Sequence, residues 1–229
     1  MATPESAVGG LFPRERRTLA PGAVHVPDWL TLEQQQELVK ACRGWARGPV
    51  PMWRATTPGG QAMSVQTVTL GWYWLPYRYS RTADDRGGAA VEPMPDWLIA
   101  MGKRAVADAY EDPAAGEAYT PDSALINFYD EGAKMGMHQD DDEHDARAPV
   151  VSLSLGNRCL FRFGNLETRA KPYIDVDLCS GDLFVFGRES RLAFHGVPKT
   201  FPSTADPRVG ITTGRLNITL RDTGMDRRR

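Results

Sequence analysis

The sequence has few cysteines and no long apolar segment. Its three cysteines, Cys42, Cys159 and Cys179, are far apart and form no CxxC pair, which argues against a disulfide framework or a zinc knuckle. The first residues show neither the basic region nor the apolar run of a secretion signal, and no segment reads as a membrane span. We therefore expect a cytoplasmic protein that does not associate with membranes.

The chain also lacks a large net charge. Its 27 basic and 29 acidic residues give −2, so the overall field does not favour binding to nucleic acid or an anionic membrane. The stretch from Asp130 to Asp145 differs, because seven acids and one base give it a net charge of −6. Carboxylates this dense repel one another, so the stretch is either a solvated loop or the lip of a cation-binding site.

Apolar periodicity predicts helices in the first half of the chain and strands in the second. Thr31 and Gln34 are typical of a capping box, which begins a helix expected over residues 31–46. A second helix is expected from about Pro95 to Tyr110. From Ser123 onward apolar and polar residues alternate, and turn residues separate the alternating runs.

This order of elements predicts an α+β fold. The strands form a double-stranded β-helix, or jelly roll, and the N-terminal helices buttress one of its sheets. No change in composition marks a second domain, so we expect a single domain over residues 21–222. We expect a flexible N-terminal segment over residues 1–20 and a flexible basic tail over residues 223–229.

A metal site is indicated by two histidines and an aspartate. His138 and Asp140 are two residues apart, so on an extended backbone both side chains leave the same face. Together with His195 they match the facial triad of non-haem Fe(II) oxygenases. The HxD pattern also arises by chance, and histidines in the core or on the surface remain the alternative.

The segment RLNITLR, residues 215–221, indicates an anion site. Strand alternation sends Arg215 and Arg221 to one face and the leucines to the other. If the apolar face packs outward, both guanidinium groups point into the barrel, where buried arginines need anionic partners. A dicarboxylate cosubstrate would supply them. The alternative is an exposed edge strand with solvated arginines.

Several ordered motifs carry a family resemblance. Residues 125–156 (LINFYDEGAKMGMHQDDDEHDARAPVVSLSLG), 187–197 (GRESRLAFHGV) and 215–221 resemble the AlkB family of Fe(II)- and 2-oxoglutarate-dependent nucleic-acid demethylases, in particular its bacterial members. Residues 57–65 (TPGGQAMSV) resemble the start of the family's substrate lid, which we expect over residues 57–80 as a β-rich nucleotide-recognition lid. The resemblance covers about residues 20–222.

The resemblance implies a cofactor set of Fe(II), 2-oxoglutarate and O₂. In this sequence the implied iron ligands are His138, Asp140 and His195. The implied 2-oxoglutarate residues are Asn127, Tyr129, Arg215, Asn217, Thr219 and Arg221. It does not assign either arginine to a particular carboxylate.

The resemblance also implies substrate contacts. These are Trp72 stacking on the target base opposite His138, Tyr77 and Tyr79 on the substrate strand, and Asp142 facing the exocyclic amine. The family's substrate-contacting arginine aligns with Thr168 without a gap and with Arg169 after one insertion, and we take Arg169. The alternative for the aromatic residues is ordinary strand packing.

The function implied by the resemblance is direct-reversal alkylation repair. N-alkylated bases of the 1-methyladenine and 3-methylcytosine type in DNA or RNA would be demethylated oxidatively, with release of succinate, CO₂ and formaldehyde. We expect a monomer that acts on alkylated single strands. Two alternatives remain: a 2-oxoglutarate-dependent hydroxylase of a protein or small molecule, and a non-enzymatic metal-binding jelly-roll module.

Overall fold

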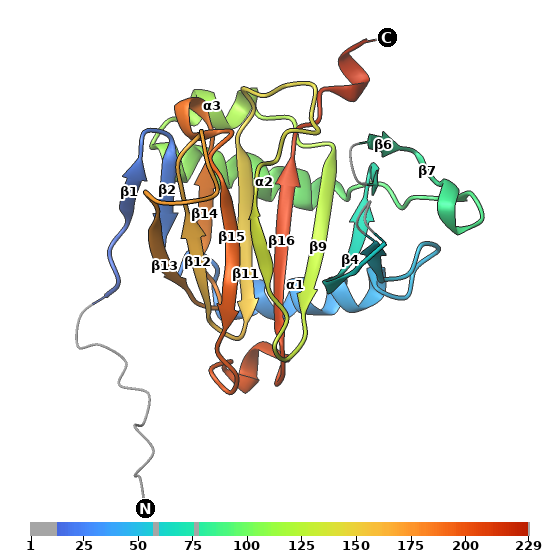
Figure 1. Ribbon diagram of the computed structural model, residues 1–229, viewed down its shortest axis with the longest axis horizontal. Helices are drawn as coiled ribbons and strands as arrows, with labels where there is room; N and C mark the ends of the chain where they lie inside the picture. The colour runs from blue at the N-terminus through green and yellow to red at the C-terminus, as the bar shows by residue number, and fades with distance from the viewer. Residues whose placement is uncertain (1–12, 57–59, 76–77, 229) are drawn as a thin grey trace, which may run out of the picture.

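The computed structural model describes residues 13–56, 60–75 and 78–228 (Figure 1). The helices are α1 (Leu32–Trp45), α2 (Asp96–Tyr110) and α3 (Pro113–Ala118), with short 3₁₀ turns η1 (Asp84–Arg86), η2 (Arg188–Ser190), η3 (Pro207–Val209) and η4 (Met225–Arg228). Two β-hairpins stand apart from the main sheets: β5 (Tyr73–Leu75) with β6 (Arg78–Ser80), and β7 (Thr82–Ala83) with β8 (Ala89–Ala90).

The remaining strands form two antiparallel sheets. The larger sheet contains β1 (Arg17–Ala20), β2 (Ala23–Val26), β3 (Trp53–Thr56), β4 (Ala62–Leu70), β9 (Ser123–Tyr129), β11 (Val150–Gly156), β14 (Leu183–Phe186) and β16 (Arg215–Arg221). The smaller sheet contains β10 (Met135–His138), β12 (Cys159–Phe163), β13 (Ile174–Leu178) and β15 (His195–Thr200). The strand orders are β1-β2-β14-β11-β16-β9-β4-β3 and β10-β15-β12-β13, as expected for a jelly roll.

Both predicted helices are present, and they lie behind the larger sheet (Figure 1). The capping box is confirmed: the Gln34 amide donates to Thr31 Oγ1 over 3.3 Å, and the Thr31 amide donates to Gln34 Oε1 over 3.0 Å. Leu38 and Val39 face the core from α1. No helix of the described residues is long and apolar enough to cross a membrane.

Strand alternation gives the larger sheet two different faces. Leu153 and Ile218 are register partners on β11 and β16, and both are fully buried in the apolar core that the helices share. Ser152 and Thr219 are the next partners and face the smaller sheet. Each buried aliphatic side chain contributes roughly 1.5–3 kcal/mol to stability. Since β16 lies between β11 and β9, the exposed-edge alternative for this strand is wrong.

The N-terminal part contributes more to the sheets than the sequence predicted. β1 to β4 form the two outer parts of the larger sheet, although the alternating pattern predicted its strands only from Ser123 onward and residues 57–80 were expected as a separate β-rich lid. β1, β2 and β3 have four residues each, too few for a clear alternating pattern. Their pairing depends on partners far along the chain, such as β14 for β2 and β9 for β4.

The ordered chain extends beyond the predicted boundaries at both ends. Residues 17–20 of the segment expected to be flexible form β1, which pairs with β2. At the C-terminal end η4 covers most of the expected flexible tail, and Asp226 accepts a 2.5 Å hydrogen bond from Arg81. Residues 1–12 and Arg229 lie outside the described residues.

A buried carboxylate joins the N-terminal strands to the rest of the sheet. Asp182 has a fully buried side chain and accepts hydrogen bonds from both terminal nitrogens of Arg14 over 2.7 Å and from His25 Nε2 over 2.9 Å. The backbone amides of Asp28 and Cys179 also donate to it. Burial by itself raises the pKa of Asp182, but the hydrogen bonds from His25 and Arg14 bring it below its usual value.

We expect Asp182→Ala to lower the free energy of unfolding by about 3–5 kcal/mol, because it leaves His25 and Arg14 without their anion. Urea titration at pH 7 measures the loss. The exposed pair of Asp177 with Arg158 gives a matched control, and Asp177→Ala should cost less than about 1 kcal/mol.

The pH dependence provides a second check on Asp182. Since its pKa is lower in the folded state, its stabilisation is complete above the unfolded value of about 4 and is lost as the pH falls through the folded value. Equal losses for the two variants at pH 7 would contradict a special role for this carboxylate.

Candidate active site

The two histidines of the predicted triad lie side by side in the smaller sheet. His138 ends β10 and His195 begins β15, and the two are register partners. Directly opposed residues of antiparallel strands point to the same face, and the ring centroids are 4.4 Å apart. Asp140 follows two residues after β10, and one ligand atom from each of the three residues lies within 4.8 Å of the others.

Hydrogen bonds fix the tautomer of both imidazoles. His138 Nδ1 lies 3.0 Å from the Gly136 carbonyl oxygen, and His195 Nδ1 lies 2.9 Å from that of Ala193. A carbonyl only accepts, so each Nδ1 carries the proton and each Nε2 keeps a free lone pair. Burial, with the neighbouring His138, lowers the pKa of His195 to about 4, which keeps that ring neutral.

The third ligand is a buried carboxylate with an unused oxygen. Asp140 Oδ1 lies 3.6 Å from His138 Nε2, and Asp140 Oδ2 lies 3.7 Å from His195 Nε2. Oδ2 is buried and has no hydrogen-bond partner among the described residues. Burial favours a raised pKa for Asp140, but attraction from the Arg221 guanidinium holds it well below its usual range. Two imidazoles and one carboxylate suit Fe(II) and leave further octahedral positions open.

A cavity of about 390 Å³ between the sheets contains these three residues. The polar face of β16 lines it, and all six predicted 2-oxoglutarate residues take part: Asn127, Tyr129, Arg215, Asn217, Thr219 and Arg221. The neutral members are held by short hydrogen bonds. Thr67 Oγ1 donates to Asn127 Oδ1 over 2.8 Å, and Asn217 Nδ2 donates to Ser152 Oγ over 2.8 Å.

The two arginines of β16 differ in their surroundings. Arg215 is 1% exposed and donates to Ser154 Oγ over 2.9 Å, but its Nε and Nη1 have no partner among the described residues. Arg221 is already paired, because Nη2 lies 2.7 Å from Asp140 Oδ1 and Nη1 lies 2.7 Å from Glu143 Oε1. The protein itself therefore supplies anionic partners for Arg221, which the sequence analysis expected from a dicarboxylate cosubstrate. The buried Nε of Arg221 has no hydrogen-bond partner in the part of the chain that the structure describes.

Glu143 and Arg191 are site residues that the sequence analysis missed. The Glu143 carboxylate is fully buried between two arginines, with Arg191 Nη2 2.9 Å from Oε2 and Arg221 Nη1 on Oε1. Arg191 Nη1 also donates to the Asp140 carbonyl oxygen over 2.6 Å. The net charge of −6 between residues 130 and 145 was the available signal, because self-repulsion of that size requires a cation from elsewhere in the chain.

The predicted stacking residue is not the one at the cavity. Trp74 lines the cavity and donates through Nε1 to Asp142 Oδ2 over 2.8 Å. Trp72 instead donates to Asp122 Oδ2 over 3.2 Å, and the Arg81 guanidinium lies 3.8 Å from the centroid of its ring. The two indoles are held by carboxylates from different segments, Asp122 for Trp72 and Asp142 for Trp74.

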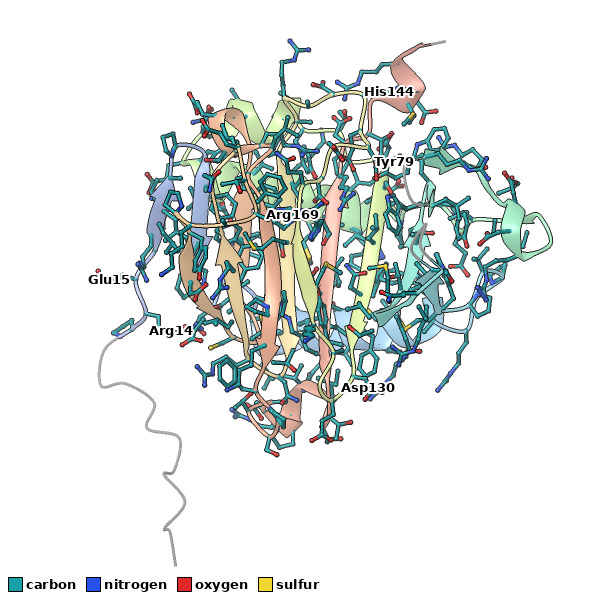
Figure 2. All side chains as sticks on the ribbon, in the orientation of Figure 1. Arg14, Glu15, Tyr79, Asp130, His144 and Arg169 are labelled. Atoms are coloured by element: carbon teal, nitrogen blue, oxygen red, sulfur yellow. The ribbon has the colours of Figure 1, made fainter. Side chains whose placement is uncertain are left out.

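The other predicted substrate contacts lie in two places: some line the cavity, and one contacts the buried ion pairs beside it. Asp142 and Arg169 line the cavity, and burial raises the pKa of Asp142. Tyr79 instead contacts the buried carboxylate that lies between Arg191 and Arg221: its hydroxyl donates to Glu143 Oε1 over 2.5 Å. Figure 2 shows Tyr79 toward the hairpin side of the larger sheet and Arg169 over the smaller sheet. Tyr77 lies outside the described residues.

The metal site yields a direct prediction. We expect the protein to bind one Co(II) or Fe(II) per chain, and His195→Ala to weaken binding by more than about 100-fold, because it removes a neutral imidazole donor. Titration followed by the visible spectrum of Co(II) measures the affinity. His144 lies outside the three-residue cluster, so His144→Ala should bind as the wild type does. Equal weakening in both variants would exclude this site.

Comparison with known proteins gives consistent matches. A family model described as the 2OG-Fe(II) oxygenase superfamily matches residues 22–221. The alpha-ketoglutarate-dependent dioxygenase AlkB homolog of Caulobacter vibrioides is 37% identical over 210 residues, which cover 89% of each chain. The alpha-ketoglutarate-dependent dioxygenase AlkB of Escherichia coli is 39% identical over 172 residues, covering 71% of this chain and 76% of that protein.

Plant relatives match as well. DNA N(6)-methyladenine demethylase ALKBH1D of Arabidopsis thaliana is 32% identical over 225 residues, or 90% of this chain, which spans 50% of that protein's length. The solved structure of OsALKBH1 has a TM-score of 0.79 at 31% identity and covers 90% of this chain and 100% of that one. The chain therefore belongs to the AlkB family, within the superfamily of Fe(II)- and 2-oxoglutarate-dependent oxygenases.

Proposed function

We propose that this protein removes alkyl groups oxidatively from base nitrogens in nucleic acid. The observation that carries the proposal is one cavity that holds the His-Asp-His cluster, a buried arginine with two nitrogens that lack a partner among the described residues, and an indole next to a carboxylate. The names of the relatives, an AlkB dioxygenase in bacteria and a DNA demethylase in Arabidopsis, support it. The products would be the dealkylated base, formaldehyde, succinate and CO₂.

His138, Asp140 and His195 would hold Fe(II), and the two arginines of β16 would hold the two ends of 2-oxoglutarate. Arg221 lies beside Asp140, so it would serve the carboxylate next to the metal through its free Nε. Arg215 has two free nitrogens deeper in the cavity and would take the distal carboxylate. Bound in this way, Fe(II) and 2-oxoglutarate supply O₂ activation and oxidation of the alkyl carbon.

The chain's own contribution is then placement and exclusion of water. The indole of Trp74 offers a flat apolar surface on which any base can stack. Asp142 beside it offers carboxylate oxygens to an exocyclic amine. Because 1-methyladenine and 3-methylcytosine are cationic, a carboxylate at this point favours them over the neutral undamaged bases. A base must leave the stack to reach the cavity, which favours single strands as substrates.

Two features argue against the alternatives. A hydroxylase of proteins or small molecules has no need for an indole and a carboxylate paired at the cavity wall. A structural metal module would normally fill the positions that three ligands leave open. That the protein works as a monomer in the cytoplasm remains a prediction.

The test is formaldehyde release from a single-stranded oligonucleotide containing 1-methyladenine. With Fe(II), 2-oxoglutarate and air we expect the wild type to turn over, and His138→Ala to lose at least about 100-fold, since it lacks a metal ligand. His144→Ala, outside the cluster, is the control. An RNA strand of the same sequence assayed in parallel gives the preference between DNA and RNA.

Succinate formed from 2-oxoglutarate without any loss of the base's methyl group would argue for a different substrate. Turnover on undamaged duplex that exceeds turnover on the methylated strand would rule out the proposal.

The charge of Asp142 generates a further prediction. Asp142→Asn keeps an oxygen that can accept from Trp74 but removes the negative charge. We expect kcat/KM for the cationic 1-methyladenine to fall by about 10-fold or more, while that for the neutral 1-methylguanine falls by less than about 3-fold. Parallel assays on the two oligonucleotides measure the ratio. An unchanged ratio would mean that this carboxylate does not select for charge.

A further inference from the structure

The β5–β6 hairpin is attached to the site at two neighbouring carboxylates. Trp74 on β5 and Tyr79 on β6 are cross-strand register partners. The Trp74 indole donates to Asp142 over 2.8 Å, and the Tyr79 hydroxyl donates to Glu143 over 2.5 Å. One end of this pair therefore lies at the cavity wall, where a base would stack, and the other end reaches a buried ionic network.

That network is a closed ring that includes the metal ligand Asp140. The Asp140 carboxylate pairs with Arg221, Arg221 pairs with Glu143, and Glu143 pairs with Arg191. Arg191 closes the ring by donating to the Asp140 carbonyl oxygen over 2.6 Å. Two carboxylates and two guanidinium groups cancel in charge, and all four side chains are at most 8% exposed. Because the effective dielectric constant is low around buried groups, moving one of these charged side chains strongly changes its electrostatic interaction with the others.

Tyr79 connects the hairpin to this ring through two members at once. Its hydroxyl donates its proton to Glu143 and accepts from Arg221 Nη1 over 3.1 Å. Arg221 also lines the cavity, and its buried Nε has no partner among the described residues. The Tyr79 hydroxyl is thus one of the groups that hold the Arg221 guanidinium in its position between Asp140 and Glu143.

We propose that Tyr79 is a positioning residue that couples binding of a base against Trp74 to binding of 2-oxoglutarate at Arg221. A base that stacks on Trp74 sets the position of the hairpin, the cross-strand pair carries that position to Tyr79, and Tyr79 orients Arg221. Coupling between two sites is reciprocal, so bound 2-oxoglutarate must improve binding of the alkylated strand by the same factor. This inference rests on the proposed function, because it takes 2-oxoglutarate and a base as the two ligands.

The experiment measures the dissociation constant of 2-oxoglutarate by calorimetry on the Mn(II)-loaded protein without O₂. It is measured with and without a saturating trinucleotide that contains 1-methyladenine. For the wild type we expect the trinucleotide to lower the dissociation constant by about 5-fold or more. For Tyr79→Phe, which removes only the hydroxyl, we expect about 10-fold weaker binding of 2-oxoglutarate, because a hydrogen bond to charged groups is lost. The effect of the trinucleotide should fall to less than about 2-fold in this variant.

Tyr110→Phe is the matched control, because it removes another partly buried tyrosine hydroxyl that donates to the Gly22 carbonyl oxygen, outside the ring. We expect it to keep the wild-type ratio. A structural defect in Tyr79→Phe would weaken 2-oxoglutarate binding equally with and without the trinucleotide, so an unchanged ratio overturns the inference. A wild-type ratio of one overturns it too. If the wild type binds no 2-oxoglutarate at all, the proposed function itself fails.

Hydrogen exchange on the wild type gives a test that does not depend on a variant. We expect 2-oxoglutarate with Mn(II) to slow the exchange of the amides in β5 and β6 by about 5-fold or more, compared with Mn(II) alone. Amides of β7 and β8, which form a separate hairpin, serve as the internal reference. Equal exchange of both hairpins in the two states would overturn the coupling.

Discussion

The burial of the Asp140 carboxylate is the constraint that the rest of the site satisfies. An isolated charge in that position would cost several kcal/mol, so the fold surrounds it with two imidazoles and a guanidinium. Arg221 in turn needs Glu143, and Glu143 needs Arg191. One buried metal ligand thus requires a set of ionic partners that includes Glu143, three residues away, and two arginines from distant segments of the chain.

β16 shows how one strand serves stability and chemistry together. Its odd-numbered residues point toward the cavity, and its even-numbered residues enter the core shared with the helices. Because both faces are buried and both edges are paired, the strand has little freedom to shift. Arg215 can therefore remain buried with two free nitrogens, a cost that the surrounding apolar packing offsets.

Patterns among residues close in the chain predicted much of the fold and of the site. The capping box at Thr31, the alternation of β16 and the HxD spacing each depend on residues close in the chain, and the structure bears them out. The outer strands of the larger sheet and the Glu143–Arg191 pair depend on contacts between distant segments, which no local pattern encodes. The position of Trp74 rather than Trp72 at the cavity goes with their different distant partners, Asp142 and Asp122, which a local motif cannot report.

The register pair His138 and His195 also has a mechanical meaning. β10 is an outer strand of the smaller sheet, and within the described part of the chain it pairs only with β15. A divalent ion held by both imidazoles would cross-link this edge strand to its neighbour, in addition to the backbone hydrogen bonds. A one-residue slip of β10 would turn His138 to the opposite face and break this cross-link. A bound metal would therefore help to hold the strand alignment that creates its own site.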